Sequence, residues 1–245
     1  MKSGFSAVFS ILVFINNTVS AQSPQEDSAF YQEAISNTLS IYNGRLGYQS
    51  PIYNGSRYLR PAGSFRAGSP YFLTDSFTHN SWAVYDDIRF DSLNLLYEDL
   101  NQHLVSKSSK YQLQLVNQRI KSFSISGHRF IRLVSDSLNS GIKETGFYEE
   151  LYQGRSVVLK WTSKEIVEEP SISEGVVRHI DASYDYFIKK GNKYYRVKSK
   201  RELADVFQDR QNEMEKFIKK SHLKFRRDPD NTLIRSVRYY DLIRY

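Results

Sequence analysis

The chain contains no cysteine among its 245 residues, and it has only 12 glycines and 6 prolines. The lack of cysteine excludes disulfides, thiol nucleophiles, Cys-based zinc sites, iron–sulfur ligation and a bacterial lipoprotein anchor. Low glycine and proline exclude collagen and low-complexity fibres, and 40% hydrophobic residues exclude an intrinsically disordered chain. The composition therefore predicts a folded protein with a sizeable hydrophobic core.

Motifs of the common catalytic classes are also missing. The sequence has no Gly-x-Ser-x-Gly elbow, no His-Glu-x-x-His pair and no Gly-x-x-x-x-Gly-Lys phosphate loop. Ser-x-x-Lys occurs at Ser140–Lys143 and Ser221–Lys224, but without the companion motifs of the β-lactamase class. We therefore predict no catalytic residue and no cofactor.

Histidines and carboxylates give no clear metal or acid–base site. His179 and Asp181 can share one face of a strand, but the sequence indicates no third ligand, so we predict no metal site. Adjacent acids on a strand point to opposite faces and cannot act together as acid and base. Such pairs occur at Asp86-Asp87, Glu149-Glu150 and Glu168-Glu169.

The first residues have the pattern of a secretory signal peptide. Lys2 precedes an apolar stretch from Phe5 to Ile15, and Val19-Ser20-Ala21 supplies the small residues of a cleavage site. As a helix this stretch covers roughly 16 Å, about half of a bilayer core, so we expect cleavage after Ala21 rather than an anchor. An exported chain without cysteine fits a bacterial envelope, and we expect a periplasmic or extracellular protein.

Positive charge is concentrated near the C-terminus. After removal of residues 1–21 the chain keeps 33 Lys+Arg against 27 Asp+Glu. Residues 189–245 contain 17 Lys+Arg and 8 Asp+Glu, whereas residues 22–188 contain 16 and 19. Export argues against nucleic acid, so the expected partner is an anionic envelope component or another envelope protein. The simpler interpretation is that these cations only solubilise helix faces. The candidate contacts for an anionic surface are Lys189, Lys190, Lys193 and Arg196.

The apolar pattern divides the chain into four segments. A signal peptide at 1–21 is followed, at 22–70, by an amphipathic helix from Gln25 to Tyr42 and a turn-rich stretch to Pro70. At 71–198, apolar and polar residues alternate with period two, which predicts an antiparallel sheet of about eight to ten strands. Basic helices packed on the sheet are expected at 199–245.

Tight turns join the predicted strands, so we expect a β-meander or half-barrel within an α+β protein. The turn dipeptides are Asp86-Asp87, Ser126-Gly127, Gln153-Gly154 and Gly191-Asn192. Two or three C-terminal helices follow. Ser199 and Glu202 form a capping-box pair, and the pattern after them fits either one helix to about Lys220 or two helices broken near Asp209. Asp228-Pro229 is a typical helix start.

A set of turn and aromatic motifs resembles a family of exported proteins from Bacteroidota-type bacteria that has no assigned activity. The resemblance covers nearly the whole chain after the signal peptide, and it implies an exported protein folded as one unit without identifying a catalytic residue. The motifs are Tyr42-Asn43-Gly44, Gly68-Ser69-Pro70-Tyr71-Phe72-Leu73, Val84-Tyr85, Gly127-His128-Arg129-Phe130, Gly146-Phe147-Tyr148, Leu151-Tyr152-Gln153-Gly154, Phe225-Arg226-Arg227-Asp228 and Tyr239-Tyr240.

Aromatic residues are abundant, with 18 Tyr, 15 Phe and 2 Trp. They can line a binding face, but an antiparallel sheet also needs cross-strand aromatic pairs, and we favour this structural role. Together these features predict a non-enzymatic exported envelope protein that binds an unknown ligand. The alternative is a hydrolase of envelope glycans or lipids whose carboxylates come from separate strands.

Overall fold

The computed structural model describes residues 30, 31, 34, 35, 38, 42, 46, 50–108, 111–136, 141–142, 144–173 and 175–243. The chain forms two compact units, Met1–Thr38 and Leu39–Tyr245. The predicted signal peptide lies outside the described residues, as does most of the helix expected at Gln25–Tyr42. Among the described residues of that range, Thr38 Oγ1 donates to the Ala34 carbonyl at 2.8 Å.

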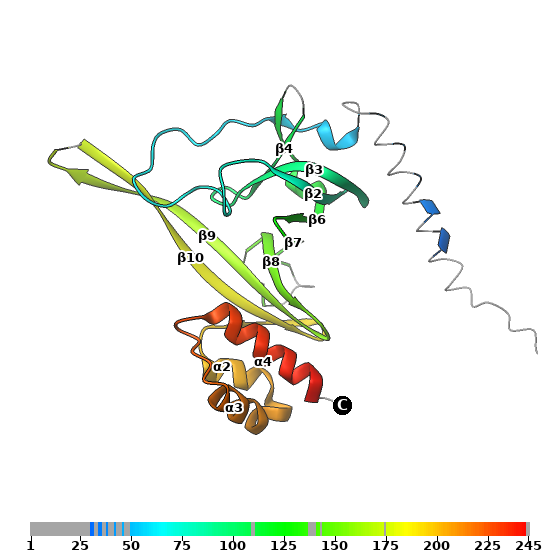
Figure 1. The fold of residues 1–245 in the computed structure, drawn as a ribbon, viewed down its shortest axis with the longest axis vertical. Helices are drawn as coiled ribbons and strands as arrows, with labels where there is room; N and C mark the ends of the chain where they lie inside the picture. Colours follow the sequence, from blue (N-terminus) through cyan, green and yellow to red (C-terminus); the bar gives the residue numbers. More distant parts are fainter. Residues whose placement is uncertain are drawn as a thin grey trace, which may run out of the picture. The chain divides into compact units, whose positions relative to one another are not determined.

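The second unit is built on one open antiparallel sheet of eleven strands (Figure 1). The strands are β1 Ser56–Arg57, β2 Thr78–Tyr85, β3 Ile88–Glu98, β4 His103–Lys107, β5 Gln112–Gln114, β6 Ile120–Ile125, β7 His128–Leu133, β8 Gly146–Gln153, β9 Ser156–Ser171, β10 Gly175–Lys190 and β11 Lys193–Val197. Their order across the sheet is β1-β5-β4-β3-β2-β6-β7-β8-β9-β10-β11. The predicted α+β class and antiparallel sheet are confirmed, and β1 is a short strand in the segment predicted to be irregular.

Of the predicted meander or half-barrel, the strands do not form one continuous meander. β2 to β5 form one meander and β6 to β11 another, and β6 pairs with β2 instead of β5. A 3-10 turn, η3 Asn117–Arg119, leads the chain back to β2. There the Asp86 N–H donates to the Arg119 carbonyl at 2.9 Å, and the Arg119 guanidinium donates to the Asp86 carboxylate. These contacts explain why β6 starts beside the end of β2.

Three of the four predicted turn dipeptides lie between strands, and the fourth, Gln153-Gly154, begins on the last residue of β8. Asp86 and Asp87 join β2 to β3 with φ of 50° and 62°, and Ser126 and Gly127 join β6 to β7 with φ of 50° and 83°. Two successive positive φ values define a turn whose twist matches that of a hairpin. The dipeptide at Gly191 closes β10 and β11 as expected.

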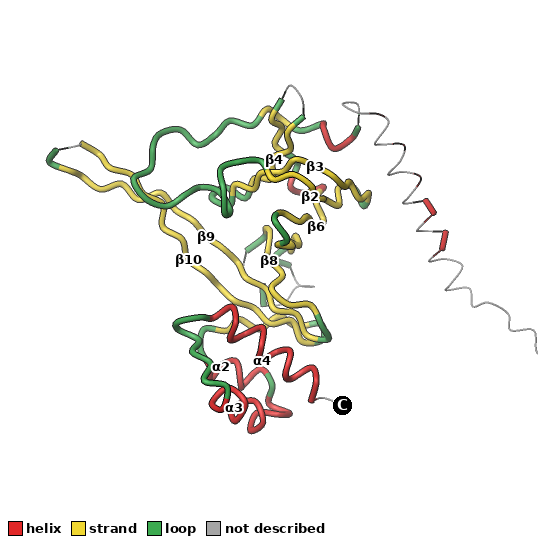
Figure 2. Tube along the Cα trace, viewed as in Figure 1, coloured by secondary structure: helices red, strands yellow, loops and turns green. Residues whose placement is uncertain are grey.

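The turn-rich segment lies against the sheet. Its loop passes beside β10, where the Ile180 N–H donates to the Ala67 carbonyl at 3.0 Å (Figure 2). Gly68 has φ of +78°, and a Cβ there would lie 2.3 Å from the Ile180 carbonyl oxygen. Only glycine fits this close approach. The loop ends at β3, where the Phe72 N–H donates to the Tyr97 carbonyl at 2.9 Å.

About half of the described aromatic side chains are buried in the core. Phe123 and Phe130 stack at 4.8 Å, and Tyr97 packs edge-on against both rings. In the C-terminal helices, Tyr240 is fully buried and packs on Phe207. The structural role favoured for the aromatic residues therefore fits the packing.

Three helices cover one face of the sheet near β8 to β11. They are α2 Lys200–Val206, α3 Gln211–Lys220 and α4 Pro229–Ile243. The 3-10 turn η4 Gln208–Arg210 separates α2 from α3, which corresponds to the second of the two alternatives expected for this stretch. Val158, Ile188 and Val197 of the sheet pack with the buried side chains of the helices. The opposite face packs Leu159, Phe187 and other residues in a separate core cluster. No helix in the described part of the chain has the length and apolarity needed to cross a membrane.

Candidate anion-binding surface

The register of the β10–β11 hairpin divides the four predicted contact residues between two faces of the sheet. Lys190 lies opposite Lys193, so both point to the face that carries the helices. Lys189 lies opposite Tyr194, and Arg196 lies opposite Phe187, so these two point to the other face. The four cations therefore do not form one surface.

Lys190 is a structural residue with an anionic partner. Its ammonium donates to Asp209 Oδ1 at 2.6 Å and to the Val206 carbonyl at 3.2 Å, and its side chain is only 22% exposed. Tyr240 donates to the other carboxylate oxygen of Asp209 at 2.8 Å. Burial opposes the charge of Lys190, but the hydrogen bonds to Asp209 and Tyr240 outweigh it and raise its pKa. Lys190 therefore ties the hairpin to the helices.

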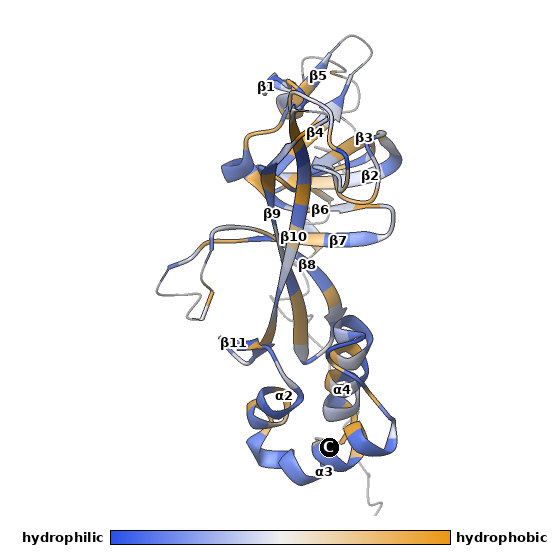
Figure 3. Cartoon of the chain, turned by 90° about the vertical axis from the view of Figure 1, so that its left-hand side faces the viewer, coloured by the Kyte–Doolittle hydropathy of each residue, from blue (hydrophilic) through white to orange (hydrophobic). Residues whose placement is uncertain are grey.

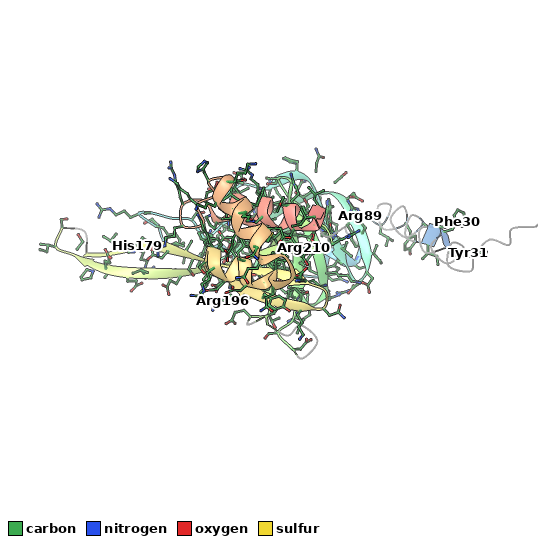
Figure 4. All side chains as sticks on the ribbon, turned by 90° about the horizontal axis from the view of Figure 1, so that it is seen from below. Phe30, Tyr31, Arg89, His179, Arg196 and Arg210 are labelled. Atoms are coloured by element: carbon green, nitrogen blue, oxygen red, sulfur yellow. The ribbon has the colours of Figure 1, made fainter. Side chains whose placement is uncertain are left out.

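The other three cations of the hairpin have separate surroundings. Arg196 donates to Asp185 through Nε at 2.9 Å, and the Lys189 ammonium lies 5.5 Å from the centre of the Tyr194 ring. Lys193 is exposed. Figure 4 places Arg196 and Arg210 beside the helices, whereas His179 lies on the part of β10 that extends away from them.

The structure also places the weak metal and acid–base candidates. His179 Nε2 lies 3.6 Å from Asp181 Oδ1, and no group of three or more possible metal ligands exists among the residues described. On β8 the adjacent acids point apart, as predicted. Glu149 contacts His128 Nδ1 at 2.5 Å, and Glu150 forms an ion pair with Arg129 at 3.1 Å.

Six cations gather instead around an open pocket of about 550 Å³ at the helical end. We call it the basic pocket, and its lining is Lys198, Ser199, Lys200, Arg201, Lys224, Phe225, Arg226 and Arg227. All six Lys and Arg side chains are exposed, and none of them forms an ion pair with any described residue. Figure 3 colours α2 and α3 mainly as hydrophilic. The pocket therefore concentrates positive charge without internal neutralisation.

Buried neighbours hold the backbone of the first three cations. Val197 and Leu203 are buried, so Lys198, Lys200 and Arg201 are carried on a fixed strand end and first helical turn. The Ser199 hydroxyl accepts from the Glu202 N–H at 3.2 Å, and the Glu202 carboxylate accepts from the Lys198 N–H at 2.8 Å. The predicted cap is thus present, but the returning bond goes to residue 198 instead of 199.

The second group of cations lies on the segment between α3 and α4. The Leu223 N–H donates to the Ile218 carbonyl at 3.1 Å and the His222 N–H to the Lys219 carbonyl at 3.1 Å, with His222 at φ of 51°. This pair of bonds is a Schellman ending. Leu223 and Phe225 are then buried against the helices, which leaves the intervening Lys224 and the following arginines in solvent.

The two acids beside the pocket are occupied by backbone groups. Glu202 accepts from the Lys198 N–H, and Asp228 Oδ1 accepts from the Asn231 N–H at 3.1 Å as the N-cap of α4. Neither carboxylate lies within ion-pair distance of a pocket cation. Because each cation repels the others, an anion with more than one negative charge is the complementary ligand.

The sequence carried a signal for this site. Lys198-Ser199-Lys200-Arg201 and Lys224-Phe225-Arg226-Arg227 are two short basic runs, and each precedes or begins a helix. The four predicted contact residues lie in the neighbouring β10–β11 hairpin instead. Only the packing of α2 against the segment before α4 brings the two runs together.

The most deeply buried carboxylates lie at the far end of β3. Glu98 is 1% exposed and accepts from the Tyr58 hydroxyl at 2.7 Å and from Asn101 Nδ2 at 2.6 Å. Asp99 is 2% exposed and forms an ion pair with Lys164 at 2.7 Å. Burial raises the pKa of Asp99 to about 6, although the hydrogen bond from Lys164 lowers it. Both carboxylates are occupied by internal partners, and neither lines the basic pocket.

Comparison of the chain with protein-family models, with curated proteins and with solved structures gave no match.

Proposed function

We propose that the protein is a non-enzymatic exported envelope protein that binds an anionic envelope component through the basic pocket. The single observation that carries this proposal is the group of six exposed cations without ion-pair partners around one pocket. In the strands of the sheet most described cations pair with a carboxylate, so a group of unpaired cations held together on a fixed backbone needs a functional explanation. The signal peptide expected from the sequence supports the location.

The chemistry of the pocket favours a compact group with several negative charges. Lysine offers three donors and arginine a planar fork, and both bind phosphate oxygens well. The buried Phe225 adds an apolar edge next to these donors. Phosphorylated headgroups of envelope lipids combine such charges with apolar chains, and they are the proposed ligand class.

The hydrolase alternative gains no support from a specific observation. Its expected feature is a pair of carboxylates facing each other across a polar cleft. The adjacent acids of β8 face apart and have separate basic partners, and the basic pocket has no carboxylate in its lining. We therefore propose a binding function and not hydrolysis.

Vesicle binding tests the proposal. The full chain is sedimented with vesicles of phosphatidylglycerol and phosphatidylcholine, or of phosphatidylcholine alone, from about 0.05 to 0.5 M salt. We expect binding only to the anionic vesicles and loss of binding at high salt. Each Lys or Arg near an anionic surface contributes about 1 kcal/mol. The variant Lys200→Gln/Arg201→Gln/Lys224→Gln/Arg226→Gln should therefore bind about a hundredfold or more weakly. Equal binding of this folded variant would refute the proposal.

A further inference from the structure

A second pocket, of about 650 Å³, lies beside the other end of the sheet. We call it the polar pocket. Its volume is within the range of small-ligand sites. Its lining includes Arg60, Asp75, Phe77, Asn94, Lys107 and Gln112. They come from the two ends of the loop between β1 and β2 and from β3, β4 and β5, which are neighbours in the sheet. No residue of the basic pocket lines it.

Two cations of the polar pocket are held by neutral groups. Arg60 Nη2 donates to the Asp75 carbonyl at 3.1 Å, and the guanidinium carbon lies 5.4 Å from the centre of the Tyr71 ring. The Lys107 ammonium lies 5.7 Å from the centre of the Phe77 ring. Such cation–π contacts orient a charge without neutralising it. Neither cation pairs with a carboxylate among the described residues, so both keep their charge for a ligand.

The remaining lining groups suit hydroxyl groups. Asn94 and Gln112 are half-buried amides on strands, and each can both donate and accept. The Asp75 carboxylate only accepts, and the Ser76 hydroxyl donates to it at 3.3 Å. A carboxylate in the lining accepts hydrogen bonds from sugar hydroxyls. Phe77 gives an apolar wall to the same pocket.

We infer that the polar pocket binds an acidic saccharide. Its carboxylate pairs with Arg60 and Lys107, its hydroxyls bond to Asp75, Asn94 and Gln112, and one face of a sugar ring lies near Phe77. This inference is independent of the proposed function, because the two sites share no residue and require different ligands. The combination of two unneutralised cations, a hydroxyl acceptor, two amides and an aromatic ring distinguishes this pocket from the basic pocket.

Calorimetric titration of the full chain with tetragalacturonate tests the inference. We expect saturable binding of tetragalacturonate. Neutral maltotetraose lacks the carboxylates and should bind at least about tenfold more weakly. Lys107→Gln and Arg60→Gln should each weaken tetragalacturonate binding about tenfold. Asn94→Ala should weaken it a few-fold through the hydroxyl contacts. Lys107→Gln provides a test even if Arg60→Gln alters the loop, because Lys107 lies on a strand.

Arg57→Gln is the matched control, because Arg57 is an exposed cation of β1 outside the lining. It should keep full binding. The inference is overturned if tetragalacturonate shows no saturable binding, or if Arg57→Gln weakens binding as much as Lys107→Gln. It is also overturned if tetraglutamate binds as tightly as tetragalacturonate, because the site then recognises charge alone.

Discussion

Cations in the sheet and cations in the basic pocket differ in what surrounds them. Most Lys and Arg side chains of the described strands lie within 4 Å of a carboxylate, from the exposed pair of Lys121 and Asp87 to the buried pair of Lys164 and Asp99. The six cations of the basic pocket have no such partner. Lysine and arginine occur in both regions. The difference therefore separates cations that stabilise the fold from cations that remain available to a ligand.

The largest effect is expected where a paired cation is buried. Lys164 donates to the Ser69 and Tyr71 carbonyls at 2.8 and 2.9 Å, besides its pair with Asp99. Lys164→Met leaves a buried carboxylate without its counter-charge, and it should lower the free energy of unfolding by about 3 kcal/mol or more. Urea denaturation measures this. Lys121→Met, at an exposed pair, is the control and should cost under about 1 kcal/mol. Similar costs for the two variants would contradict the distinction between buried and exposed pairs.

The same buried pair predicts a pH dependence. Burial raises the pKa of Asp99 from 3.8 to about 6, so the folded state binds this proton more tightly than the unfolded state. As pH falls from about 6 to about 4, Asp99 should therefore add up to about 3 kcal/mol of stability. The measurement is the difference in unfolding free energy between the wild type and Asp99→Asn across this range. A flat difference would show that Asp99 titrates normally.

Protonation of Asp209, which occurs at lower pH, should reduce the free energy of unfolding, whereas protonation of Asp99 raises it. Burial opposes its charge, but hydrogen bonds from Lys190 and Tyr240 outweigh it and lower the pKa of Asp209 below 3.8. Its stabilisation is present above that value and is lost as pH falls through the folded pKa.

A smaller effect on stability is expected for Lys190, which was a candidate ligand contact. Lys190→Met removes its bonds to Asp209 and the Val206 carbonyl and should cost about 1 to 2 kcal/mol. Binding to anionic vesicles at a temperature where the variant is folded should not change. The control is Lys193→Met, because Lys193 lies on the same face but is exposed, and its stability should be unaltered. A loss of vesicle binding in Lys190→Met would place Lys190 in the ligand site.

The smallest effect on stability is expected in the basic pocket. Lys200→Gln/Arg226→Gln removes two charges that repel their neighbours and have no ion-pair partner. The free energy of unfolding should change by less than about 0.5 kcal/mol, and any change should be a gain. Thermal and urea unfolding at low salt measure this. A large loss would mean that these cations stabilise the fold.

Sequence patterns predicted those structural elements that depend only on residues close together in the chain. The positive φ turn at Asp86-Asp87 and the N-cap at Asp228 depend on neighbouring residues, and both lie where expected. The break near Asp209 is one of the two alternatives that the local pattern allows. The return of β6 to β2 depends on Arg119 contacting a turn 33 residues away, which no local pattern contains.

The sequence indicated a basic site near the C-terminus but did not identify the residues of the basic pocket. Composition placed the positive charge at the C-terminal end of the chain, but it did not distinguish paired from unpaired cations. Lys190 has a partner in Asp209 only because a helix turn packs against the hairpin. The basic pocket forms only because Leu223 and Phe225 are buried and hold the second basic run beside the first.

Charge-matched variants test the central claim most directly. Lys200→Gln/Arg226→Gln removes two cations from the basic pocket, and Lys219→Gln/Lys220→Gln removes two exposed cations from the end of α3 outside its lining. Binding of both full-length variants to phosphatidylglycerol vesicles is measured at the same salt concentration. We predict a loss of about tenfold or more for the pocket variant and less than about threefold for the α3 variant. Equal losses would show that net charge, rather than the basic pocket, determines binding, and would contradict the account.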